Sequence, residues 1–326
     1  MKQVITIETV YHGGMQFQQL GYFVAVAETC HFTQAAERMG VAQPSLSQQI
    51  GALEKDLGER LFHRERGNVC LTAAGDVLLP IARRLLADAD IVRHEIRELG
   101  ELRTGRVRLG ATPSLCTGLL PAMLAAFHAD YPGIQLVVHE GGSRDLERDL
   151  SQGALDLALI IASQGRQDPA LTTVPLLVED LVVVSAWHTT PPVRRSRIRI
   201  DELHGQPLVM FRRGYELRDF TVDACRDAGF EPSFAIEGGE MDAVLGFVQA
   251  GLGIAVVPST VVGDRLRTTP FTAPGLTRTI GLARRRDVGL PRAGAALQHR
   301  IISSLADADD AGQLPPGTTS RLPGPR

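Results

Sequence analysis

The sequence predicts an α+β protein in which a helical module is followed by an α/β module. From Met15 to Thr104, apolar residues recur at helical spacing. From Gly105 onward, short β-branched runs alternate with amphipathic stretches, a pattern that predicts βαβ units on a mostly parallel sheet. The length of 326 residues allows two or three domains of roughly 100–200 residues each.

Composition excludes several classes of protein. Lys and Arg number 34 and Asp and Glu 37, giving a formal net charge of −3, which argues against a polybasic coat, an acidic tail or a disordered chain. Taken alone it also argues against nucleic acid, whose partners are usually basic. No stretch approaches the ~20 apolar residues of a membrane helix, and the apolar run Val4–Ile7 is too short for a secretory signal.

The four cysteines are too widely spaced for a CxxC motif, so we expect reduced thiols in a cytoplasmic protein, with no metal site and no cofactor. They are Cys30, Cys70, Cys116 and Cys225.

Residues 15–75 predict three short helices after a flexible extension at 1–14. The first covers 16–28, and the second covers 34–39, with Thr33 or a neighbour as its N-cap. The third has Pro44 in its first turn, where the missing N–H costs nothing, and Gly58 at its end. Its single apolar stripe comprises Leu46, Ile50, Leu53 and Leu57.

Two short helices joined by a tight turn form the helix-turn-helix pattern. The opposite face of the third helix carries small polar and amide side chains, which are able to pair with base edges in a major groove. These residues are Gln43, Ser45, Ser47, Gln48 and Gln49. From composition alone, a merely solvated face remains the alternative.

After the third helix, Gly67-Asn68 predicts a turn between two extended arms, where Arg64 and Arg66 can contact phosphates or a narrow minor groove. A long helix then follows, capped by Thr72, and residues 76–104 form a linker. Apolar stripes on more than one side of this helix favour a dimerisation arm over a core helix, because the module has too little other sequence to bury it.

The second module spans 105–305, and 306–326 is expected to be a disordered tail because it is rich in Pro, Gly, Asp and Thr. Helices are expected at Leu119–Tyr131 and Met241–Ala250. The expected strands are Arg106–Gly110, Ile134–His139, Leu155–Ile161, Leu181–Ser185, Leu208–Phe211 and Ile254–Val257.

Residues 15–75 closely resemble the winged helix-turn-helix of LysR-type transcriptional regulators. The resemblance is carried by Phe32-Thr33-Gln34-Ala35-Ala36, Gln43-Pro44-Ser45-Leu46-Ser47-Gln48-Gln49-Ile50, Leu61-Phe62-His63-Arg64 and Leu71-Thr72-Ala73-Ala74-Gly75. It implies that Gln43, Pro44 and Ser47 lie at base edges, Gln48 near phosphate and Arg64 in the wing; Thr33, Ser45 and Arg66 complete the candidate DNA-binding set.

The resemblance implies double-stranded DNA, a second copy of the chain (dimer or tetramer) and RNA polymerase as partners. One departure concerns the wing. Family members often carry basic residues at 67 and at 68 or 70, where this chain has Gly67, Asn68 and Cys70. The wing is therefore weakly basic.

The second module resembles the effector-binding domain of the same family, which is similar to type 2 periplasmic binding proteins. The matching segments are Gly110-Ala111-Thr112-Pro113-Ser114, Leu155-Asp156-Leu157-Ala158 and Gly251-Leu252-Gly253-Ile254-Ala255-Val256-Val257-Pro258. The resemblance implies two α/β lobes with a ligand cleft between them: lobe I at 105–177 and 264–305, and lobe II at 178–263.

Thr112 and Ser114 are the leading candidates for contact with a small-molecule effector, possibly an organic acid. Hydroxyls and free N–H groups where a strand passes into a helix favour an anion; plain N-capping of the next helix is the alternative, and the two roles are compatible. Ile161 occupies a position where some members that respond to aromatic acids have Arg, which weakens the case for a di-acid. Weaker candidates are Phe211, Arg212, Leu217, Met241 and Val257; Arg212 either pairs with a carboxylate or is solvated.

One segment resembles the redox centre of the family's peroxide-sensing members, which use two cysteines nine residues apart. Here Cys225 is present, but the partner position holds Glu216. Because a disulfide switch needs both sulfurs, this difference argues against peroxide sensing by that route.

An enzyme and a solute-binding protein are the two alternative classes of function. An enzyme is disfavoured because the sequence has no GxSxG, HExxH, P-loop or GxGxxG motif in its required context. A cytosolic solute-binding or sensor protein without promoter control fits the second module but not the attached helix-turn-helix. A gel shift on the chain's own upstream DNA distinguishes a transcriptional regulator from both alternatives, because tight, salt-sensitive binding is expected only of the regulator.

Overall fold

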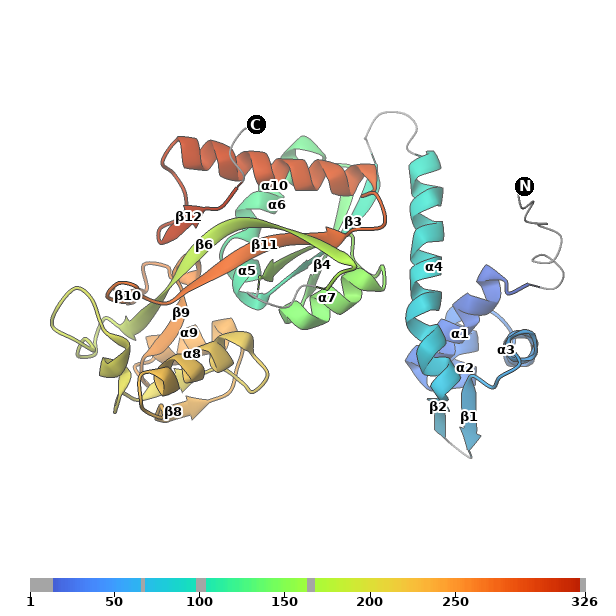
Figure 1. The fold of residues 1–326 in the computed structure, drawn as a ribbon, viewed down its shortest axis with the longest axis horizontal. Coiled ribbons are helices and arrows are strands. Elements are labelled where there is room, and N and C mark those ends of the chain that lie inside the picture. The colour runs from blue at the N-terminus through green and yellow to red at the C-terminus, as the bar shows by residue number, and fades with distance from the viewer. Residues whose placement is uncertain (1–13, 66–67, 98–103, 163–167, 323–326) are drawn as a thin grey trace, which may run out of the picture. The chain divides into compact units, whose positions relative to one another are not determined.

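The computed structural model describes residues 14–65, 68–97, 104–162 and 168–322, and the chain forms two compact units that divide near residue 98 (Figure 1). The predicted extension at 1–14 thus lies almost wholly outside the described residues, as do Arg66 and the end of the predicted linker, 98–103.

The first unit contains the three predicted short helices: α1 (Phe17–Thr29), α2 (Phe32–Met39) and α3 (Gln43–Leu57). The N-cap of α2 is His31, whose Nδ1 accepts a hydrogen bond of 3.2 Å from the backbone N–H of Thr33. Helices α2 and α3 each end at a glycine with positive φ, Gly40 and Gly58, and the sequence analysis predicts the end at Gly58.

The wing and the long helix follow. Strands β1 (Phe62–Glu65) and β2 (Asn68–Leu71) pair antiparallel, and α4 covers Ala73–Arg97. The Thr72 hydroxyl accepts from the Gly75 N–H at 3.1 Å, which confirms Thr72 as the cap of α4. The core of this unit joins all four helices to the wing through Phe23, Ala36, Ile50, Phe62 and Ala82.

The second unit is built on an eight-stranded sheet with the order β10-β6-β11-β5-β3-β4, to which β9 and β12 add by pairing with β6. Strand β3 (Gly105–Ala111) pairs parallel with β4 (Ile134–Glu140) and β5 (Leu157–Ile161). The long β6 (Leu171–Ala186) pairs antiparallel with β9 (Ala255–Pro258), β10 (Leu266–Pro270), β11 (Thr277–Arg285) and β12 (Thr318–Ser320).

The prediction of a mostly parallel sheet is therefore wrong for this sheet. Parallel pairing holds only where helices connect the strands: α5 (Pro113–Thr117) and α6 (Leu120–Asp130) join β3 to β4, and α7 (Ser143–Ser151) joins β4 to β5. The later strands β9, β10, β11 and β12 pair antiparallel with β6 instead. Pairing between strands that are far apart in the chain leaves no periodic pattern in the sequence.

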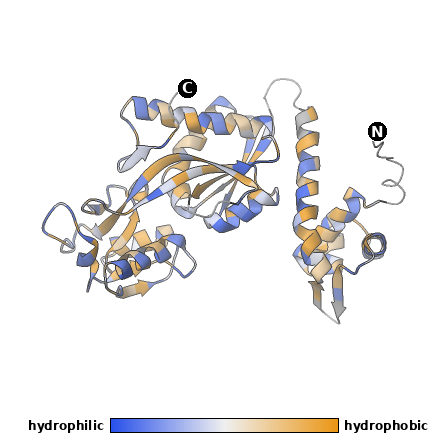
Figure 2. Ribbon diagram, in the orientation of Figure 1, coloured by the Kyte–Doolittle hydropathy of each residue, from blue (hydrophilic) through white to orange (hydrophobic). Residues whose placement is uncertain are grey.

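Lobe II has its own small layer, in which β7 (Leu208–Met210) pairs parallel with β8 (Phe234–Glu237). Helices α8 (Glu216–Asp227) and α9 (Met241–Gln249) flank it, and short turns of 3-10 helix lie at Ile200–Leu203 (η2) and Ser259–Val261 (η3). Figure 2 shows that hydrophobic and hydrophilic residues are mixed along both the long strands and the helices of the second unit.

Strand β6 belongs to both lobes. Its first half, through Leu177, packs in the lobe I core with β3, β5 and β11, and its second half, from Leu181, packs in the lobe II core. The lobe II core continues through Leu266 and Phe271, and lobe I resumes near Ile280, so the second boundary lies later than the expected 264.

The expectation of a disordered tail at 306–326 differs from the structure. Helix α10 (Arg292–Asp310) extends into this segment, and β12 pairs with β6. The composition misleads because the apolar stripe of α10 ends at Leu305, while β12 is held by backbone hydrogen bonds that need no large side chains. No helix among the described residues is long and apolar enough to cross a membrane.

Candidate functional site

The candidate DNA-reading face lies on the first two turns of α3. Leu46, Ile50 and Leu53 are fully buried and fix the orientation of the helix. Gln43, Pro44, Ser45 and Gln48 are exposed, and Ser47 is half-buried. The apolar stripe thus turns the predicted residues outward together.

The other candidate residues for DNA contact differ in position and exposure. Thr33 is exposed in the first turn of α2. Gln49 is half-buried, and its side-chain oxygen accepts from the Gln19 amide at 3.2 Å, so it braces α3 against α1. Arg64 lies in β1 of the wing, and Arg66 falls outside the described residues.

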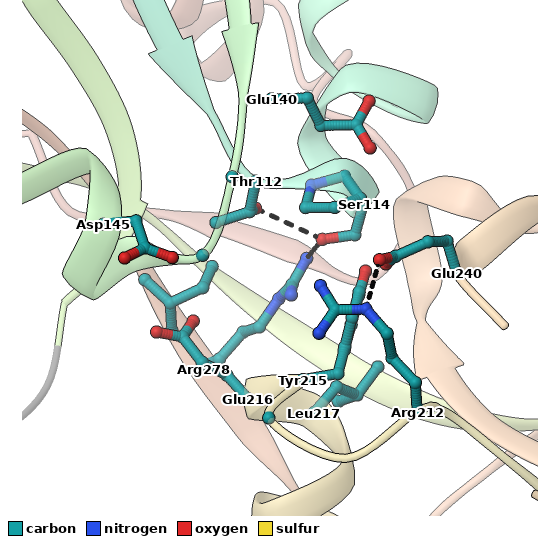
Figure 3. A pocket seen from close by; sticks show the side chains of 15 residues that line it. Thr112, Ser114, Glu140, Asp145, Arg212, Tyr215, Glu216, Leu217, Glu240 and Arg278 are labelled. Carbon is teal, nitrogen blue, oxygen red and sulfur yellow. Dashed lines mark hydrogen bonds and ion pairs between the residues drawn. The ribbon is translucent and has the colours of Figure 1, made fainter. Parts of the chain in front are cut away.

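A cavity of about 140 Å³ lies between the lobes of the second unit (Figure 3). Five of the eight predicted effector-contacting residues line it: Thr112, Ser114, Ile161, Arg212 and Leu217. The other three, Phe211, Met241 and Val257, are buried in the lobe II core, where β7, α9 and β9 pack together.

The floor of the cavity carries a buried ion pair. Arg278 on β11 and Glu179 on β6 are cross-strand partners, joined at 2.8 Å, with side chains that are 7% and 0% exposed. The Glu179 carboxylate also accepts from the backbone N–H and the hydroxyl of Thr260. Arg278 donates to the Ser114 hydroxyl at 2.9 Å, and the Thr112 and Ser114 hydroxyls lie 3.4 Å apart. The pair therefore joins two long strands and both lobes at one point.

Another hydrogen bond crosses from one lobe to the other. The Ser143 hydroxyl, at the start of α7, donates to the Glu216 carboxylate at 2.8 Å and accepts from the Ile161 N–H at 3.1 Å. Burial raises the pKa of Glu216, while the hydrogen bonds from Ser143 and the charges of Arg278 and Arg144 oppose that rise.

Tyr215 projects into the cavity beside Arg212 and Glu240 (Figure 3). Its ring stacks on Phe211 with the centroids 4.6 Å apart, and the residue is only 8% exposed. Within the described chain its hydroxyl has no hydrogen-bond partner, and neither has Oε2 of Glu240, whose other oxygen accepts from Arg212. Burial raises the pKa of the Tyr215 hydroxyl, so it stays protonated at neutral pH.

Sequence reasoning missed most of the charged lining. Glu140 ends β4, Asp145 lies in the first turn of α7, and Glu240 is the N-cap of α9. Acidic residues at helix starts are common because they satisfy the helix dipole, so their positions carried no distinctive signal. The sequence analysis names Glu216 only as the residue at the position of a cysteine in the peroxide-sensing members. Arg278 lies in β11, a strand that the sequence analysis does not predict.

Helix α4 exposes apolar side chains along its length within the single chain. Val77, Ile81, Val92 and Ile96 are between 40% and 66% exposed. Contact of such a row of apolar side chains with water is unfavourable, and exposed apolar patches often mark interaction sites. This helix therefore fits the prediction of an association surface.

All four cysteines are free thiols. Cys225 is buried, and burial raises its pKa to about 11. Glu216 and Cys225 lie on the same helix, α8, nine residues or roughly 13 Å apart at 1.5 Å per residue. Among the described residues, no group of three or more His, Cys, Asp or Glu is placed to hold a metal ion.

Two family models match most of the chain. Residues 17–76 match the model of bacterial regulatory helix-turn-helix proteins of the lysR family, and residues 100–303 match the LysR substrate binding domain. The chain belongs to the LysR family. This LysR-type protein is a DNA-binding transcriptional regulator with a helix-turn-helix domain and an effector-binding domain, and the match over 17–76 favours it over the solute-binding alternative.

Relatives of the regulator have known roles. The DNA-binding transcriptional dual regulator OxyR of Escherichia coli is 30% identical over 276 residues, covering 83% of this chain and 90% of that protein. The transcriptional dual regulator GltC of Bacillus subtilis is 30% identical over 280 residues, covering 82% and 90%. Among solved structures, full-length OxyR from Pseudomonas aeruginosa aligns with a TM-score of 0.70 at 27% identity, covering 89% of this chain and 95% of that one. The LysR family regulator CbnR aligns at 0.66 with 25% identity, covering 89% and 99%.

Proposed function

We propose that this LysR-type regulator reads paired half-sites of double-stranded DNA with α3. Gln43, Pro44 and Ser47 contact base edges, and Gln48 contacts phosphate. Thr33, Ser45, Arg64 and Arg66 support the docking from α2, α3 and the wing. The support is the exposed polar face of α3, set by three buried residues beneath it.

A second copy of the chain supplies much of the affinity. Residues 15–75 contain five Lys and Arg against six Asp and Glu, so one module carries little attraction for phosphate. Two linked modules raise the effective concentration of the second contact and strengthen binding without new contacts. The exposed apolar row on α4 supports dimerisation, and pairing of dimers gives the tetramer we propose.

The cavity of the second unit binds a small-molecule effector and passes the signal to the DNA-binding unit. One observation carries this proposal: Ser114 in lobe I contacts Arg278, which pairs with Glu179 on the strand shared by both lobes. A ligand that contacts Ser114 or Arg278 therefore acts at the junction of the lobes. By favouring one lobe arrangement, it shifts the population of arrangements in the oligomer and the spacing of the DNA-binding units.

The protein acts by binding rather than by catalysis, in the cytoplasm, where promoter DNA and RNA polymerase are its partners. Several relatives are named hydrogen peroxide-inducible genes activators. We do not propose a peroxide response for this chain, because Glu216 occupies the position of the first cysteine. The second, Cys225, is buried, and burial raises the pKa of its thiol.

The test is a fluorescence-anisotropy titration of the full-length protein on DNA from upstream of its own gene, over a series of salt concentrations. We expect tight binding that weakens steeply as salt rises, and weaker binding to a scrambled duplex. Binding that is absent, insensitive to salt or equal on both duplexes would overturn the proposal.

A further inference from the structure

The lining of the cavity has more negative than positive charge. Four carboxylates line it, from Glu140, Asp145, Glu216 and Glu240, against the two guanidinium groups of Arg212 and Arg278. This balance does not favour an organic acid, which is one of the effector classes that the sequence suggests.

The two cations are already neutralised by close partners. Arg278 pairs with Glu179 beneath the cavity, and Arg212 pairs with Glu240 at its edge. Neither guanidinium offers an uncompensated positive charge to a ligand. A second anion placed here would meet a surplus of carboxylates.

The carboxylates are only partly neutralised. Asp145 has a surface ion pair with Arg148 at 2.9 Å. In the described part of the chain, Glu140 and Glu216 have no ion-pair partner; Glu216 accepts hydrogen bonds from Ser143, and the charges of Arg278 and Arg144 act on it without a direct ion pair. Glu216 is partly buried, so its negative charge is poorly solvated.

Tyr215 points independently to a ligand. This residue is more than nine-tenths buried, lines the cavity, and has a hydroxyl without a partner among the described residues. A buried hydroxyl without a hydrogen bond destabilises the folded state, and a ligand group that donates to its oxygen would lower that cost. The positive charge of Arg278 and the negative charges of Glu240, Glu140 and Glu216 all act on this hydroxyl, and the three carboxylates line the same cavity.

We propose that the effector carries a cationic nitrogen, an ammonium or amidinium group, which binds among Glu140, Glu216 and the Tyr215 hydroxyl. An N–H donor satisfies the hydroxyl oxygen, and its charge compensates the two carboxylates. Thr112, Ser114 and Arg278 line the same cavity and present hydrogen-bond donors for an oxygen of the same molecule, including a carboxylate whose charge the ligand's own nitrogen balances. The effector is thus a small amino compound rather than a simple organic acid. This inference rests on the proposed function of the cavity.

The experiment uses the full-length protein and matched trios of small compounds, each trio comprising an amino acid, the acid that lacks its amino group and the amine that lacks its carboxyl group. Trios based on amino acids of two to six carbons, such as γ-aminobutyrate, butyrate and propylamine, are screened at about 10 mM by thermal shift. Magnesium chloride serves as the inorganic cation control. We expect at least one nitrogen-bearing compound to raise the melting temperature while its nitrogen-free acid does not.

Variants locate the binding. Glu140→Gln removes the charge from an exposed residue, so the fold is retained, and Glu216→Gln keeps an acceptor for Ser143. Each is expected to weaken binding of the nitrogen compound by about tenfold, because a charged hydrogen bond becomes a neutral one. Asp227→Asn, which removes the same charge from an exposed site on α8, is the matched control and leaves the affinity unchanged.

The inference is overturned if only nitrogen-free acids stabilise the protein, if no nitrogen-bearing compound does, or if magnesium gives an equal shift. It is also overturned if Asp227→Asn weakens binding as much as Glu140→Gln. These results leave the proposed function open to its own test, because a regulator that responds to a nitrogen-free acid still binds its DNA in a ligand-dependent way.

Discussion

Removing Arg278 should destabilise the second unit severely. Arg278→Met leaves the Glu179 carboxylate, which is 0% exposed, with only the two donors of Thr260. Breaking a buried pair from one side typically costs about 3–5 kcal/mol, because the remaining charge stays buried and uncompensated. We expect a loss in this range in the free energy of unfolding.

The double variant separates the charge effect from simple loss of contacts. Glu179→Gln keeps an oxygen to accept from Thr260, and combined with Arg278→Met it leaves no buried charge. The double variant should recover about 2 kcal/mol of the loss, within the range of coupling energies measured for contacting residues. Arg226→Met removes an exposed arginine on α8 as the control and should change stability by less than about 0.5 kcal/mol.

The assay is urea unfolding followed by tryptophan fluorescence. The chain has a single tryptophan, Trp187, at the end of β6, where its indole donates to the Asp264 carbonyl at 3.1 Å and Arg267 lies over the ring. The signal therefore reports on the second unit without a contribution from the DNA-binding unit. A loss below about 1 kcal/mol in Arg278→Met, or a double variant no more stable than the single one, would refute the reasoning.

Three further predictions concern DNA specificity, the ligand response and pH. Ser47→Ala should lower discrimination between specific and scrambled DNA by about 1–3 kcal/mol in anisotropy titrations, and unchanged discrimination would refute its role at a base edge. Ser114→Ala should abolish the ligand-induced thermal shift while DNA binding persists, whereas Thr117→Ala, an exposed residue on the same helix, should change neither property; an intact shift in Ser114→Ala would remove Ser114 from the site. The raised pKa of Glu216 means that the folded state binds this proton more readily than the unfolded state, so its contribution to stability falls as pH rises from about 4.5 through the raised value. Glu216→Gln should therefore be more stable than the wild type near pH 7 without ligand, with the difference vanishing towards about pH 4; a difference that grows on acidification would contradict the sign.

The DNA-binding unit could be predicted almost completely because its signals are local. Helix ends are marked by Gly40, Gly58 and Thr72, and the stripe on α3 alone sets which side chains face outward. Each of these features depends on residues a few positions apart, so no long-range pairing had to be known.

The second unit could be predicted only in part because its decisive contacts are long-range. Glu179 and Arg278 are 99 residues apart, and Ser114 and Arg278 are 164 apart. Thr112 and Ser114 were found because they follow a strand in a recognised segment. Phe211 is one of the weaker candidates that the sequence offers for effector contact, but its ring stacks on Tyr215 within the lobe II core and does not line the cavity.

The coupling between the cavity and α3 is tested most directly by linkage. The affinity of a ligand that raises the melting temperature is measured by calorimetry on the full-length protein, with and without its specific duplex. A ligand that changes DNA affinity must have its own affinity changed by DNA by the same factor, typically about 5–150-fold. We predict a change of that order with the specific duplex and none with a scrambled one; equal ligand affinity under all three conditions would contradict the coupling.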